Sequence, residues 1–231
     1  MLSKKTIITK AKDQKVIRGI DPLRLRSKDI DRCVDIVVDV CKSHIVDRTA
    51  VEFNDPWLSR KTMKKKNIYR EFSPIHRMDR ITKHIISNFQ NQFPIDIRHT
   101  INKGPEYTYF TSKKDRYESD WVCVPEPERF IESKYYYKIL LHELSHAACS
   151  RTRLCLKFTE TEEEVAVEAA ALTICFISGY NLWENCIAYM NNWSYDKNDE
   201  KLSINTKRQW DTLKNKTKRI VRYLLMGKDR I

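Results

Sequence analysis

The segment His142-Glu143-Leu144-Ser145-His146 places two imidazoles and one carboxylate within five consecutive residues. On an α-helix, residues four positions apart are separated by about 40° around the axis and by one turn along it. His142 and His146 can therefore direct both imidazoles at one metal ion. Glu143 projects about 100° from His142, where its carboxylate can reach a water molecule on that ion without binding the ion itself. The spacing predicts a helical HExxH metal site.

Zinc is the metal that this set of side chains favours. Zinc binds imidazole nitrogen and carboxylate oxygen, and two histidines with one glutamate leave its fourth position open for water. The ion lowers the pKa of that water towards neutrality, and a neighbouring carboxylate can accept the proton as the hydroxide attacks a carbonyl. The alternative is a pair of histidines that only pack and hydrogen-bond. The apolar run before His142 favours the metal site, with one zinc ion and Glu143 as the general base.

A third ligand is expected from a helix shortly downstream, where acidic residues are concentrated. Glu164 and Glu168 share a helix face, so one could bind the metal while the other orients a histidine. Glu164 is the preferred ligand, and Glu163 and Glu168 are the alternatives. Thr161 and Glu164 also fit a capping box, and a first helical turn favours acidic residues in any case. Glu168 leads into an apolar run, which indicates a partner in the interior.

Hydrophobic spacing indicates which elements must position these residues. Apolar residues between Ile30 and Ile45 fall on one helical face, as in an amphipathic helix. A small sheet and several further helices follow, which is an α+β arrangement. The expected elements are helices over about 27–45 and 78–89, strands at Ile95–His99, Tyr107–Thr111 and Trp121–Val124, and helices from Ser133, over about 161–178, 181–193 and 205–226.

The net charge of +12 is unevenly distributed. Residues 1–73 contain 18 Lys and Arg against 10 Asp and Glu. A basic N-terminal third is typical of a surface that binds nucleic acid or another polyanion, but composition alone favours a solvated lysine-rich surface. The candidate contacts to DNA are basic residues close to Tyr69 and Phe72: Lys61, Lys64, Lys65, Lys66 and Arg70.

The seven cysteines form no CxxC pair and lie largely in apolar runs. A scattered, odd-numbered set predicts reduced thiols in a cytoplasmic protein and not a disulfide framework. No apolar run approaches the roughly 18 residues of a membrane span, and the N-terminus lacks the apolar stretch of a signal peptide. We therefore expect the protein to stay in the cytoplasm of the cell that makes it, with no membrane partner.

Several stretches between about residues 93 and 226 follow one another in a characteristic order. They are Phe93–His99, Asp120–Pro125 with Phe130, Tyr136–His146, Arg153-Leu154, Glu163–Glu168, and Glu184–Tyr189 with Trp193. This series resembles the C-terminal zincin-like metallopeptidase domain of ArdC-type antirestriction proteins, which are found on plasmids and phages. The resemblance implies a zincin-like fold in which His142, His146 and a glutamate of residues 163–168 bind zinc, with Glu143 as the general base.

The chain departs from that family in two places. Ala147-Ala148-Cys149-Ser150 stands where the family typically has Trp-Thr-Gly-His, so the rim of the active-site cavity can differ. Residues 1–73 do not resemble the family's N-terminal domain, which binds single-stranded DNA. We therefore divide the chain into a basic N-terminal extension with one amphipathic helix, residues 1–73, and a zincin-like metallopeptidase domain, residues 74–231.

These observations predict a zinc-dependent metallopeptidase that acts on a protein or peptide substrate and comes from a phage, virus or mobile element. The strand Trp121–Val124 is expected to run beside the cleft and to pair with an extended substrate. A second hypothesis is a DNA-binding antirestriction protein in which zinc mainly holds the fold. A third is an interaction module with a vestigial metal site.

Overall fold

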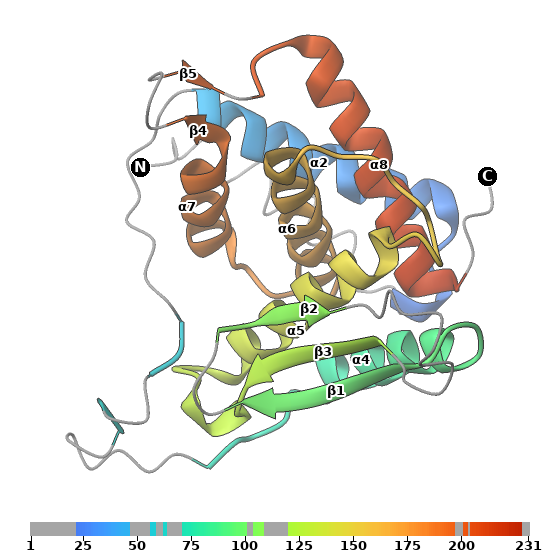
Figure 1. Cartoon of the computed structure of the whole chain (residues 1–231), viewed down its shortest axis with the longest axis vertical. Helices are drawn as coiled ribbons and strands as arrows, with labels where there is room; N and C mark the ends of the chain where they lie inside the picture. The colour runs from blue at the N-terminus through green and yellow to red at the C-terminus, as the bar shows by residue number, and fades with distance from the viewer. Residues whose placement is uncertain are drawn as a thin grey trace.

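The computed structural model describes residues 22–46, 56–58, 62–63, 71–100, 104–108, 120–196, 201–202 and 204–227. A three-stranded sheet lies along one side of the molecule and most of the helices lie on the other (Figure 1). The α-helices are α2 (Ser27–Val46), α4 (His76–Gln90), α5 (Ser133–Cys149), α6 (Glu160–Ile177), α7 (Trp183–Ser194) and α8 (Lys207–Met226). The strands are β1 (Ile95–Thr100), β2 (Glu106–Thr108), β3 (Asp120–Pro125), β4 (Tyr195–Asp196) and β5 (Lys201–Leu202), and 3-10 turns cover Pro22–Arg24 and Pro127–Arg129.

This arrangement is the predicted α+β class. Every helix predicted for the described residues is present, and so are the three strands of the main sheet. Of the predicted strand Tyr107–Thr111, only residues up to 108 are described. In the described part of the chain, no helix is long and apolar enough to cross a membrane.

The main sheet has the order β1-β3-β2. Strand β3 runs parallel to β1, with Ile97 opposite Val122, and antiparallel to β2, with Tyr107 opposite the same residue. Both sides of β3 are therefore occupied by neighbouring strands. The expectation that Trp121–Val124 pairs with a substrate is wrong, because its backbone hydrogen-bonding groups face β1 and β2.

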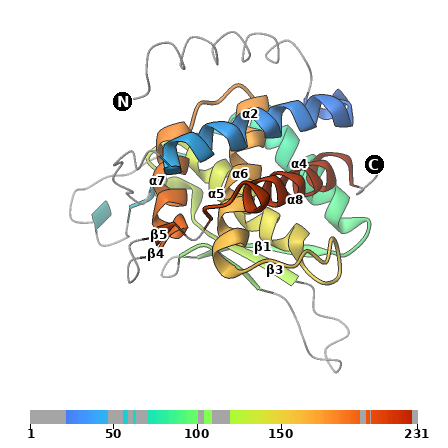
Figure 2. The ribbon, with the colours of Figure 1, turned by 90° about the horizontal axis from the view of Figure 1, so that it is seen from above.

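Helix α6 is the central helix of the fold and packs against α2, α5, α7 and α8 (Figure 2). A helix that is apolar on all sides is typical of such a buried position. From Val165 to Ile177 every residue of α6 is buried. Three consecutive alanines, Ala169–Ala171, are 0–1% exposed, and small side chains let neighbouring helices approach closely.

The N-terminus of α6 is fixed by a capping box, but not by the predicted one. The Thr159 hydroxyl accepts a hydrogen bond from the Glu162 backbone N–H, and the Glu162 carboxylate accepts one from the Thr159 N–H, both at 3.2 Å. The predicted box of Thr161 and Glu164 is wrong, because Thr161 already lies inside the helix. Glu164 is therefore not used for capping, and its carboxylate faces α5.

Helix α2 packs its apolar face against α6 and α8, so its buried side chains share one core with theirs. Charged residues spaced four apart border this contact. Lys218 lies 2.7 Å from Asp35 and Lys214 lies 2.7 Å from Asp39, and Arg222 meets Asp31 in the same way. Partly exposed ion pairs contribute little free energy each, but their spacing matches one alignment of the two helices. The domain boundary at residue 73 stays a prediction.

We predict that Ile30→Ala lowers the free energy of unfolding by about 2–5 kcal/mol, because it leaves a cavity in this core. Ile30 is 0% exposed on the buried face of α2. Lys28→Ala, on the exposed face of the same helix, should change the free energy by less than about 0.5 kcal/mol. Chemical denaturation measures both. A stable Ile30→Ala protein would contradict the packing of α2.

Candidate metal centre

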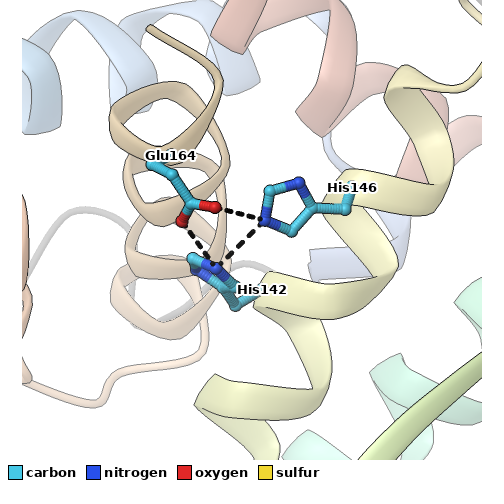
Figure 3. A group of neighbouring side chains, drawn as sticks. All are labelled: His142, His146 and Glu164. Atoms are coloured by element: carbon cyan, nitrogen blue, oxygen red, sulfur yellow. Dashed lines mark hydrogen bonds and ion pairs between the residues drawn. The ribbon is translucent and has the colours of Figure 1, made fainter. Parts of the chain in front are cut away.

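Helices α5 and α6 bring three of the predicted site residues together. His142 and His146 extend from α5 one turn apart, and Glu164 faces them from α6 (Figure 3). The two Nε2 atoms lie 3.3 Å apart. One oxygen of Glu164 lies 3.4 Å from the His142 Nε2 atom, and the other lies 3.4 Å from the His146 Nε2 atom. Three groups that could hold a metal ion thus converge on one point.

These spacings fit a tetrahedral zinc site. When nitrogen and oxygen ligands bind zinc at about 2.0–2.1 Å, tetrahedral geometry places neighbouring ligand atoms roughly 3.3–3.4 Å apart. The nitrogen and oxygen atoms of His142, His146 and Glu164 show separations of this size, and all lie within 4.8 Å of one another. Facing lone pairs of two imidazoles and a carboxylate also require a cation or protons between them. The residues present therefore fit a zinc ion.

Two further glutamates of α6 orient the imidazole rings. The Nδ1 atom of His142 lies 2.8 Å from Glu168, and that of His146 lies 2.8 Å from Glu163. A carboxylate next to Nδ1 favours the tautomer with the proton there, which leaves the Nε2 lone pair for a metal. The three glutamates that the sequence left as competing ligands thus occupy three different positions. Glu164 alone faces both Nε2 atoms, and its role as ligand stays a prediction.

Opposite charges dominate the electrostatics of the cluster. Burial alone would raise the pKa of Glu164, but hydrogen bonds from both histidines hold it well below its usual range. Burial alone would lower the pKa of His146, but hydrogen bonds to Glu163 and Glu164 raise it to about 10. A metal competes with protons for these imidazoles, because only the neutral ring binds it.

Glu143 has the environment of a general base. It lies next to His142 on α5, is 4% exposed and lines the cavity beside the metal-binding atoms. Burial raises the pKa of its carboxyl group, and the positive charge of the two histidines opposes that effect only in part. A carboxylate whose pKa is moved towards the working pH is better suited to accept and return a proton.

Sequence reasoning missed two residues that contact this cluster. Tyr189 of α7 donates a hydrogen bond from its hydroxyl to Glu164 at 2.7 Å, and its ring centre lies 5.3 Å from that of His142. Lys138 of α5 forms an ion pair of 2.6 Å with Glu168. For Lys138 the signal in the sequence was a lysine within the apolar run that precedes His142, and Tyr189 ends one of the stretches that carry the family resemblance.

A buried arginine joins the C-terminal end of α5 to the sheet. Arg153 has a side-chain exposure of 0% and donates to Asp120 of β3 at 2.7 Å. Tyr107 of β2 donates to the same carboxylate at 2.7 Å. The turn that carries Arg153 also contains Cys155, a non-glycine residue with φ 48°. This cluster fixes β2 and β3 relative to the helix that carries both histidines.

A cavity of about 920 Å³ opens beside the metal-binding atoms. Glu106 and Tyr107 of β2 border it, and Trp57 and Trp193 contribute aromatic surface. The aromatic surface continues along α7 towards the metal centre, because the Trp193 and Tyr189 ring centres lie 6.4 Å apart. The cavity wall thus combines charged and polar residues with aromatic surface from Trp57, Tyr189 and Trp193.

The residues that the sequence predicts to contact DNA lie outside the described part of the chain. They are Lys61, Lys64, Lys65, Lys66 and Arg70. DNA binding through the N-terminal extension stays a prediction from composition.

A comparison with protein families shows which family the chain resembles. The family model of the zincin-like metallopeptidases matches residues 88–206, a range that contains β1 to β3, the predicted metal ligands of α5 and α6, and Tyr189. No curated protein and no solved structure matches the chain significantly. The finer likeness to ArdC-type proteins stays a prediction.

We predict that Glu164→Gln weakens zinc binding more than about 100-fold, because it removes the carboxylate between the two Nε2 atoms. Loss of a residue that only hydrogen-bonds to a metal ligand typically weakens binding by about 10- to 100-fold. Glu160→Gln, on the exposed first turn of α6, should bind zinc as the wild type does. Competition with a chromophoric chelator measures both affinities. If Glu164→Gln retained full affinity while His142→Ala lost zinc, another group would be the third ligand.

Proposed function

Because the chain belongs to the zincin-like metallopeptidase family, we propose that it is a zinc-dependent peptidase that hydrolyses a peptide bond in a protein substrate. The observation that carries the proposal is the convergence of two imidazoles and one carboxylate at separations of 3.3 and 3.4 Å. Glu143 lines the adjoining cavity. The ligands in this proposal are His142, His146 and Glu164.

Zinc held by these three residues would supply Lewis acidity, which polarises a carbonyl group and lowers the pKa of water towards neutrality. The protein holds the ligands in place before substrate arrives, because each imidazole is hydrogen-bonded to a carboxylate on α6. Tyr189 holds the carboxylate of Glu164 from the other side. The site therefore needs little rearrangement when the metal binds.

Glu143 carries the proton in the proposed reaction. Its carboxylate accepts a proton from the attacking water as the water oxygen bonds to the carbonyl carbon of the substrate. The same carboxyl group then gives the proton to the amide nitrogen as the carbon–nitrogen bond breaks. Atoms balance, since one water adds across one peptide bond to form a carboxyl group and an amine. Low exposure keeps bulk water from competing for that proton.

The cavity supports a polypeptide substrate. Its volume of about 920 Å³ is large enough for several side chains, since ligand cavities typically measure about 300–1,000 Å³. The two tryptophans give part of its wall an apolar character. We further propose, on the likeness to ArdC-type proteins, that the chain serves a phage, virus or mobile element.

We predict that Glu143→Gln lowers peptide-bond cleavage by about 100- to 10,000-fold and leaves zinc content unchanged, because the amide cannot accept the proton yet does not touch the metal-binding atoms. Cut sites are mapped across the proteins of cells that produce the wild type or the variant. Glu184→Gln, exposed on α7, serves as the control.

Three outcomes would decide against this mechanism. Cleavage that survives Glu143→Gln would remove the general base from it. Absence of zinc in the purified wild type would overturn the proposed metal dependence. A zinc-loaded wild type that cuts no protein would favour a mainly structural role for the metal.

A further inference from the structure

Lys138 is a fully buried cation directly beneath the metal centre. It lies one helical turn before His142 on α5, and its side chain is 1% exposed. Its ammonium group is 2.6 Å from Glu168, whose side chain is 0% exposed. Removing two charges from water costs several kcal/mol for each ion, and well-packed apolar residues often replace such a pair without loss of stability. Stability alone therefore gives no reason for this pair to be ionic.

The partners of Lys138 suggest a different role. Glu168 uses its other oxygen to accept a hydrogen bond from the His142 imidazole at 2.8 Å. The ammonium group also lies 5.1 Å from the ring centre of Tyr189, within range of a cation–π contact. Tyr189 in turn donates to Glu164 at 2.7 Å. Lys138 thus contacts two residues that each orient a proposed zinc ligand. Glu168 orients His142 of α5, and Tyr189 orients Glu164 of α6.

We propose that Lys138 is a positioning residue for zinc. It fixes the carboxylate of Glu168 against the His142 ring and the ring of Tyr189 beside Glu164. In this way it aims one nitrogen and one carboxylate at the same point. It also supplies the positive charge that a wholly buried carboxylate requires. The inference rests on the proposed function, since it assigns Lys138 a role towards the metal of that site.

Zinc affinity tests the proposal directly. Lys138→Met keeps the length of the side chain and removes the charge. We expect it to bind zinc about 10- to 100-fold more weakly than the wild type in competition with a chromophoric chelator, the loss typical of outer partners of metal ligands. Lys134→Met is the matched control, because Lys134 lies one turn earlier on α5 and pairs with Glu132 near the surface. It should bind zinc as the wild type does.

A double-mutant cycle separates positioning from packing. If Lys138 acts mainly through Glu168, the loss caused by Lys138→Met should largely disappear in a Glu168→Gln background, because the partner is already gone. The double variant also carries no uncompensated buried charge, so it provides a folded protein if Lys138→Met alone does not fold. Cobalt absorption spectra of the same proteins report the ligand geometry, which a role confined to packing would leave unchanged.

The outcomes distinguish this inference from the proposed function. A wild type that binds no zinc overturns the proposed function. A wild type that binds zinc, together with a folded Lys138→Met of equal affinity and equal cobalt spectrum, overturns the role of Lys138 alone. Lys138 also lines the cavity, so a change confined to KM would make it a substrate contact and overturn the positioning role. Equal further losses of affinity from Lys138→Met in both backgrounds would show that it does not act through Glu168.

Discussion

The contact between α5 and α6 brings ionisable side chains together, from the wholly buried Glu168 to the partly exposed Glu163, and the rest of the fold is arranged around this constraint. A buried carboxylate is tolerated only when a cation or hydrogen-bond donor meets it. Glu163 and Glu168 each meet one imidazole, and Glu164 lies between both. A slip of one turn, about 5.4 Å, would leave these charges without partners. The polar network therefore selects a single alignment of α5 against α6. Hydrophobic contact alone would specify this alignment less strictly.

The surrounding elements complete that register. The alanines of α6 allow close approach, and α2, α7 and α8 enclose it. On the side of the sheet, Arg153 joins the end of α5 to β2 and β3 through Asp120. The site is thus supported by a buried helix on one side and by a hydrogen-bonded sheet on the other. This support suits a metal site, whose ligands must be held in place by their neighbours.

Periodic features of the sequence were predictable because they depend on local geometry. The helices and strands follow from apolar spacing, and the two histidines follow from the helical period. The features that were missed depend on the contact between helices. Helical spacing indicated that Glu164 and Glu168 share a face and that one of them could orient a histidine. Nothing in a single sequence places Glu163 beside His146, or Tyr189 against Glu164. The capping box was placed two residues late because Thr159 and Thr161 carry the same signal, and only the backbone shows which one starts the helix.

The turn after α5 carries an exposed thiol, that of Cys155, which can be labelled selectively. Six of the seven cysteines are buried and Cys155 is exposed. Burial raises the pKa of Cys33 and of Cys175 to about 12, so these thiols react slowly while the protein is folded. A maleimide dye added to the native protein would attach at Cys155, next to Leu156 of the cavity wall. The unaltered chain thus offers a single attachment point for a fluorescent reporter of cavity occupancy.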